Sequence, residues 1–171
     1  GINKSYDLFT PTYLTFSDAY FWKHFQHEIK QLDCIKIVPD NIVRGYRDES
    51  FLLLRRTQTP KEVVPISFSG PISFINNSGV AALRIAYGMG CDPIYLIGID
   101  VCTTDSSETH YHNVYQKNNL RITPAVRYKQ FYTEFDRTIR AMEGKRQIIS
   151  CSDISTLNKI IPYVPITDIG L

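Results

Sequence analysis

Apolar and polar residues recur at two periods along the chain, and these periods predict helices and strands in turn. Near the start, Phe21, Phe25 and Ile29 fall on one helical face at a spacing of four, behind Ser17 or Asp18 as a capping residue. Short apolar runs typical of strands lie at residues 13–16, 34–38 and 51–54. We therefore expect a strand, a helix and two further strands in the first third of the chain.

The middle of the chain carries the clearest pattern. Asn77 or Ser78 can cap a helix whose apolar positions run over residues 80–87. A continuous apolar run over 93–100 follows and ends in Asp100. Such a run is typical of a parallel strand that is buried on both faces, and it predicts that Asp100 lies at the carboxyl end of the strand.

The second half continues the alternation of helix and strand. A polar stretch over 101–123 precedes a predicted helix over 124–143 and a final strand over 147–149. This alternation is typical of parallel strands that are joined by right-handed crossovers. It predicts one α/β domain over residues 1–171, with a Rossmann-like, three-layer fold and a mainly parallel sheet.

Composition and charge narrow the classes of protein. The 171 residues are 43% hydrophobic, which fits one globular domain, and no apolar run approaches the roughly 18–20 residues that a membrane-spanning helix needs. A net charge of +2 with dispersed Lys and Arg argues against nucleic-acid binding. The four cysteines form no C-x-x-C pair, so we expect buried free thiols, no structural zinc and a cytoplasmic location.

Polar residues at the expected carboxyl ends of the strands form the first candidate site, because open parallel sheets bind ligands there. Asn77, Ser78 and Gly79 begin a helix whose free N–H groups and partial positive charge suit a phosphate or carboxylate, with an ordinary helix cap as the alternative. Asp100 suits a ribose hydroxyl, a metal or a catalytic water, or it simply caps its loop. Asn3 is expected at the same edge.

A second candidate group is the histidine-containing segment within the polar stretch. His110 and His112 share a face if the segment is extended, and they could hold a metal with Asp105 or Glu108 as a further ligand. Either histidine could instead act as a general base, because the unperturbed pKa of histidine is about 6.5. A solvated loop without function is the alternative. The sequence lacks a Walker A motif and a Gly-x-Gly-x-x-Gly motif, which argues against P-loop enzymes and standard dinucleotide dehydrogenases.

The middle of the chain also resembles a known family. Asn77-Ser78-Gly79-Val80, an apolar helix and Ile94-Tyr95-Leu96-Ile97-Gly98-Ile99-Asp100 are similar to the core of the bacterial CMP-sialic acid sialyltransferases of glycosyltransferase family 42. A related pattern occurs in the 6-hydroxymethylpterin pyrophosphokinase-like family and in uncharacterised phage-encoded relatives. The phage group has a similar histidine-rich loop, here Thr109-His110-Tyr111-His112-Asn113.

The resemblance implies roles for individual residues. Asn3 and Ser78 would contact a nucleotide, Tyr111 would lie near the phosphate, and His110 or His112 would lie near the acceptor. The transferases open with a Gly-rich strand and turn of the Gly-Asn-Gly-Pro-Ser type, which this sequence lacks. We therefore expect a chain that is truncated at its N-terminus.

Three hypotheses about function stay open at this point. The first is a nucleotide-dependent transferase, which is a glycosyltransferase with a CMP-sugar donor or a pyrophosphokinase-like enzyme that acts on a pterin with Mg²⁺. The second is a non-catalytic phage or prophage binding module, which the missing Gly-rich opening favours. The third is a metal-dependent hydrolase that uses Asp100, His110 and His112. The oligomeric state does not follow from the sequence.

Overall fold

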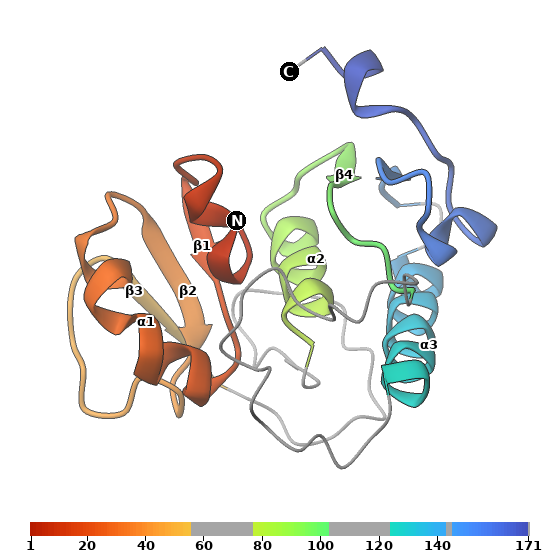
Figure 1. Cartoon of the computed structure of the whole chain (residues 1–171). Coiled ribbons are helices and arrows are strands. Elements are labelled where there is room, and N and C mark those ends of the chain that lie inside the picture. The colour runs from red at the N-terminus through yellow and green to blue at the C-terminus, as the bar shows by residue number, and fades with distance from the viewer. Residues whose placement is uncertain (56–76, 103–123, 143–144, 171) are drawn as a thin grey trace.

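The computed structural model describes residues 1–55, 77–102, 124–142 and 145–170, and it is a mixed α/β structure with parallel strands in two small sheets (Figure 1). The described elements follow in the order β1 (Tyr13–Thr15), α1 (Ala19–Gln31), β2 (Ile35–Pro39), β3 (Phe51–Leu54), α2 (Ser78–Gly88), β4 (Ile94–Leu96), α3 (Pro124–Met142) and β5 (Ile148–Ser150). Short 3₁₀ helices lie at Asn3–Asp7, Thr156–Lys159 and Ile166–Asp168.

The first sheet has the order β1-β2-β3, and both pairs are parallel. Helix α1 begins after Asp18, whose carboxylate accepts a hydrogen bond from the Tyr20 N–H at 2.7 Å. Its apolar side packs against one face of the sheet, where Phe21 and Ile29 join the buried core. Helix α2 covers the opposite face, where Ala81 and Ile85 pack against residues of β2 and β3. The sheet is therefore packed on both sides.

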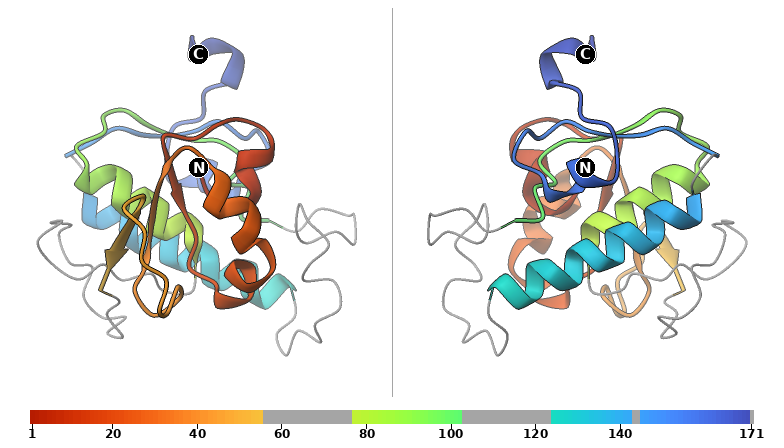
Figure 2. Two further views of the ribbon diagram at one scale, coloured as in Figure 1. Left: turned by 90° about the vertical axis from the view of Figure 1, so that its left-hand side faces the viewer. Right: turned by 90° about the vertical axis from the view of Figure 1, so that its right-hand side faces the viewer.

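The second sheet consists of β4 and β5, which are also parallel. Helices α2 and α3 run beside each other next to this sheet (Figure 2). Their apolar side chains form one buried cluster with both strands: Val80, Leu83, Ile94, Leu96, Phe135, Ile139, Met142 and Ile148. Because α2 contributes to the cores of both sheets, it is the element that joins the two halves of the structure.

The structure confirms most of the predicted elements and corrects the central strand. The sequence pattern predicts a strand over 93–100 that is buried on both faces, but β4 spans only Ile94–Leu96. Tyr95 is 37% exposed and Ile97 is 49% exposed. The physical reason is that Gly98 adopts a φ of +68°, which turns the chain out of the sheet, and that β5 is the one described strand that pairs with β4.

The structure also bears on the cysteines and on membrane-spanning helices. All four cysteines are free thiols, and Cys34 is buried, but Cys151 is only partly buried and Cys91 is exposed. The prediction of buried thiols is therefore right for Cys34, while Cys151, which the sequence also places in a strand, is partly buried and Cys91, which follows the end of α2, is exposed. Within the described part of the chain, no helix is both long and apolar enough to cross a bilayer.

Candidate functional site

Asn77 is the N-cap residue of α2. Its side-chain oxygen accepts hydrogen bonds from the backbone N–H groups of Gly79 at 2.9 Å and Val80 at 3.2 Å, as an N-cap residue does. Asn77 is 8% exposed, and its side-chain Nδ2 has no hydrogen-bond partner among the described residues. A buried amide donor without a partner is costly, so this group is available to an acceptor on a ligand.

Ser78 links the start of α2 to the end of β1. Its hydroxyl lies 2.8 Å from the hydroxyl of Ser17, which follows β1 by two residues. Either oxygen can be the donor of this hydrogen bond. The pair places two hydroxyl groups beside the positive end of the α2 dipole, and both are partly buried.

Gly79 lets the start of α2 pack closely against α3 and the end of β4. A Cβ atom at this position would lie 3.0 Å from Phe135 Cζ and 3.5 Å from Ile99 Cδ1. Only a glycine fits such an approach without displacement of a neighbour. The contact brings the helix start next to the loop that carries Asp100, which follows Ile99.

Asn3 lies at the same sheet edge. Ile2 forms a parallel bridge with Thr15 of β1, and the Thr15 N–H donates to the Gly1 carbonyl at 3.0 Å. Because Ile2 lies opposite Thr15, Asn3 lies level with Phe16, one residue beyond the end of β1. Asn3 has a φ of +49°, a conformation that asparagine tolerates better than most residues, and its buried Oδ1 has no hydrogen-bond partner in the described part of the chain.

Asp100 lies after the turn at Gly98 and receives a hydrogen bond from the Ser152 hydroxyl at 2.5 Å. Ser152 itself follows β5 by two residues, so the carboxyl ends of both strands meet in this contact. Burial and the nearby Asp100 charge raise the pKa of the Cys102 thiol. Burial, with contributions from Cys102 and Asp100, also raises the pKa of the Tyr128 phenol. The Cys102 thiol and the Tyr128 phenol are therefore neutral near pH 7.

Asn77, Ser78 and Gly79 form the start of α2, which lies against Ser17 after β1 and against Ile99 beside Asp100, and Asn3 lies at the same edge of the first sheet. The predicted residues His110, Tyr111 and His112 lie outside the described residues, so their position relative to this edge stays a prediction. Over the described ranges, no group of three His, Cys, Asp or Glu side chains could hold a metal ion.

Ser17 and Ser152 belong to the site but were not among the predicted residues. Ser17 and Ser152 each follow a short apolar strand by two residues, and Asp100 follows β4 by four. A polar residue shortly after an apolar run is a signal that the sequence offers, but the signal does not say which of these residues contacts another strand end.

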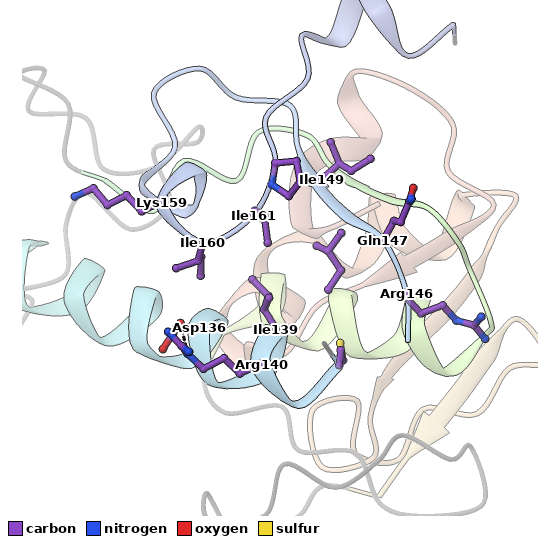
Figure 3. Close-up of a pocket in the computed structure, with 12 residues that line it drawn as sticks. Asp136, Ile139, Arg140, Arg146, Gln147, Ile149, Lys159, Ile160 and Ile161 are labelled. Carbon is purple, nitrogen blue, oxygen red and sulfur yellow. Dashed lines mark hydrogen bonds and ion pairs between the residues drawn. The ribbon is translucent and has the colours of Figure 1, made fainter. Parts of the chain in front are cut away.

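A separate groove of about 540 Å³ lies between α3 and the segment that follows β5 (Figure 3). Its floor is apolar, with Ile139 and Ile161 near its centre. Arg140 on its rim is bonded to Asp136 at 2.9 Å, and the side chains of Lys159 and Arg146 extend away from each other at its two ends. Its charged groups do not converge, so we place the candidate site at the strand ends instead.

Comparisons with known proteins find no relative. No protein-family model matches the chain, and no curated protein and no solved structure matches it. The site described above therefore rests on its own geometry.

Proposed function

We propose that this chain is a nucleotide-dependent transferase of Rossmann-like fold that binds the phosphate of its donor at the start of α2. The carrying observation is the buried Asn77 Nδ2 without a hydrogen-bond partner among the described residues, next to the Ser17–Ser78 hydroxyl pair. Together they offer amide and hydroxyl donors at the positive end of an 11-residue helix. Oxygen-rich anions are the ligands that such a helix start favours.

The remaining residues of the site support the same proposal. Asn3 offers an unpaired amide oxygen that can accept a hydrogen bond from a base or a sugar, and Asp100 offers a carboxylate for a ribose hydroxyl or for Mg²⁺. The two sheets would then be parts of one Rossmann-like arrangement around α2, with the nucleotide across the strand ends.

In the glycosyl-transfer version of the reaction, one bond forms and one bond breaks at the donor sugar. A bond forms between the acceptor oxygen and the anomeric carbon of the donor sugar, and the bond from that carbon to the phosphate oxygen breaks. The electron pair leaves with CMP, and the proton of the acceptor hydroxyl goes to a base, for which His110 and His112 are the sequence-based candidates. In the pyrophosphokinase-like version, the acceptor hydroxyl of a pterin would attack the β-phosphorus of ATP, and the bond from that phosphorus to the oxygen that leaves with AMP would break. The proton of the hydroxyl would go to the same base. Asp100 would hold Mg²⁺, which would offset the charge of the phosphates.

A titration tests this proposal. Binding of CMP, CMP-sugar analogues, and ATP with a pterin, with and without Mg²⁺, is measured by calorimetry on the wild type and on Asn77→Ala, Ser78→Ala and Asp100→Asn. We expect binding by the wild type and at least a tenfold weaker affinity in the variants. Equal affinities in all four proteins would contradict the proposed site.

A second function is favoured by one observation. Tyr13, Ile35 and Leu52 lie on the face of the first sheet that α2 covers only in part, and they are 38%, 42% and 45% exposed. Exposed apolar residues that adjoin each other are typical of protein-binding surfaces, as the non-catalytic binding module would need. Absence of any nucleotide binding, with a partner that protects these three residues, would favour the module.

A further inference from the structure

A set of hydroxyl groups holds the loop that carries Asp100. The Ser155 hydroxyl donates to the Ile99 carbonyl at 2.7 Å, and the Thr156 hydroxyl donates to the Val101 carbonyl at 2.8 Å. The Thr156 N–H also donates to the carbonyl of Asp100 at 3.0 Å. The segment after β5 therefore fixes the backbone on both sides of Asp100.

The backbone of this loop is strained as well as fixed. Val101 has a φ of +52°, which is rare for a β-branched residue because its side chain crowds the backbone there. A residue keeps such a conformation only where its surroundings impose it, and positions of this kind gather at functional sites. Val101 is buried in the cluster between α2 and α3, so packing and hydrogen bonds together impose the conformation.

Ser152 differs from the other two hydroxyl groups because it bonds the carboxylate itself. It donates to Asp100 Oδ1 at 2.5 Å, and Asp100 Oδ2 accepts no hydrogen bond from the described residues. Ser152 is in turn held in place, because the Asn158 amide donates to its carbonyl at 3.0 Å. One carboxylate oxygen is thus fixed, and the other is left for a ligand.

From this geometry we propose that Ser152 is the positioning residue for Asp100: it holds the carboxylate so that Oδ2 faces the nucleotide or its Mg²⁺. This inference rests on the proposed function for the identity of the ligand. Hydrogen-bond partners that orient a ligand-binding carboxylate are worth about 10–100-fold in affinity or activity at metal sites. We expect a similar loss here when the Ser152 hydroxyl is removed.

The chain offers a matched control for this test. Ser152→Ala removes the bond to the carboxylate, whereas Ser155→Ala removes a bond of the same loop to a backbone carbonyl. We expect Ser152→Ala to weaken the binding of CMP or of ATP with Mg²⁺ about tenfold and Ser152→Thr to restore it. Ser155→Ala loosens the backbone of the loop but keeps the bond to the carboxylate, so we expect it to weaken binding clearly less than Ser152→Ala does. A loss in Ser155→Ala as large as that in Ser152→Ala would mean a structural role only and would overturn the proposal.

Crystal structures of the ligand-free variants give a second readout that does not depend on nucleotide binding. In Ser152→Ala we expect the Asp100 side chain to occupy more than one rotamer, and in Ser155→Ala a single one. A single Asp100 rotamer in Ser152→Ala would overturn the positioning role, even if the protein binds no nucleotide. Loss of binding in Asp100→Asn with unchanged binding in Ser152→Ala would also overturn it, while the proposed function would stand.

Discussion

The side-chain oxygens of Ser17 and Ser78 lie 2.8 Å apart, although 61 positions separate the two residues in the sequence. Ser17 follows β1 and Ser78 is the first residue of α2. The contact therefore joins the end of a strand of the first sheet to the helix that packs against both sheets. If the pair also binds a ligand phosphate, its two hydroxyl groups act as one unit.

A double-mutant cycle tests this coupling. Ser17→Ala and Ser78→Ala each remove one partner of a partly buried hydrogen bond, and we expect each to lower the free energy of unfolding by about 1 kcal/mol. The double variant should lose little more than either single variant, because the bond is already broken. Chemical denaturation of the four proteins measures this, and fully additive losses would show that the two hydroxyls act independently.

Asn77 provides a prediction that separates capping from ligand binding. Asn77→Asp keeps the side-chain oxygen that accepts from Gly79 and Val80, so we expect the stability of the helix start to be kept. It removes the Nδ2 donor and adds a negative charge, so nucleotide affinity should fall at least tenfold. Asn77→Ala should lose about 1 kcal/mol of stability as well. Unchanged affinity in Asn77→Asp would remove Asn77 from the binding site.

Gly79→Ala tests the close packing at the start of α2. The new methyl group would lie 3.0 Å from the buried Phe135 ring, and we expect a loss of about 1–3 kcal/mol in the free energy of unfolding. Phe135→Leu shortens the neighbour, so the same substitution in that background should cost less. Thermal denaturation of the four proteins provides the comparison, and an equal cost in both backgrounds would locate the strain elsewhere.

Lys36 is almost fully buried at 1% exposed and holds the end of α1 against the first sheet. Its ammonium group donates to the Leu32 carbonyl at 2.6 Å and to the Ser50 hydroxyl at 3.2 Å. Lys36→Met keeps the apolar stem but removes both bonds of the ammonium group, while the Leu32 carbonyl keeps its bond from the Cys34 N–H at 3.0 Å, so we expect a loss of about 1 kcal/mol. Ser50→Ala removes the longer of the two Lys36 bonds together with an exposed bond from Ser50 to the Asp48 carboxylate, and it should cost less by urea denaturation. A larger loss of stability in Ser50→Ala than in Lys36→Met would contradict a stabilising contact between Lys36 and Leu32.

Glu28 gives a prediction about pH. A hydrogen bond from Lys4, 2.7 Å away, lowers the pKa of the Glu28 carboxyl group in the folded protein. The folded state therefore favours the charged form, and the resulting stability is present above the ordinary pKa of glutamate. It is lost as the pH falls through the lowered value. We expect wild type to be more stable than Glu28→Gln at pH 7 and the difference to disappear as the pH falls through the lowered pKa of Glu28, by denaturation at each pH.

Local patterns were sufficient to predict much of the fold. Helix α1 has apolar residues at a spacing of four behind a capping aspartate, and α2 follows the asparagine that caps it, so both could be predicted from a few adjacent residues. The length of β4 could not, because it depends on which strand lies beside it. Neither Tyr95 nor Ile97 carries a local signal that its side chain is exposed.

The candidate site shows the same division. Asn77 could be predicted because it directly precedes the helix that the apolar pattern defines, whereas Asp100 lies four residues beyond the observed end of β4. The contacts of Ser17 with Ser78 and of Ser152 with Asp100 join residues that lie 61 and 52 positions apart, and the chain must fold before either pair exists. The positive φ angles at Asn3 and Val101 arise in the same way from their surroundings.

The most direct test of the central claim is the thermal stability of the wild type and of Ser78→Ala with CMP, CMP-sugar analogues and ATP, with and without Mg²⁺. A ligand that binds the folded state alone adds about 2.7 kcal/mol of stability at a hundredfold excess over its Kd, which raises the melting temperature measurably. We predict such a rise for the wild type with one of these nucleotides and a clearly smaller rise for Ser78→Ala. Unchanged melting temperatures with all nucleotides at millimolar concentration, or equal rises in both proteins, would contradict a phosphate site at the start of α2.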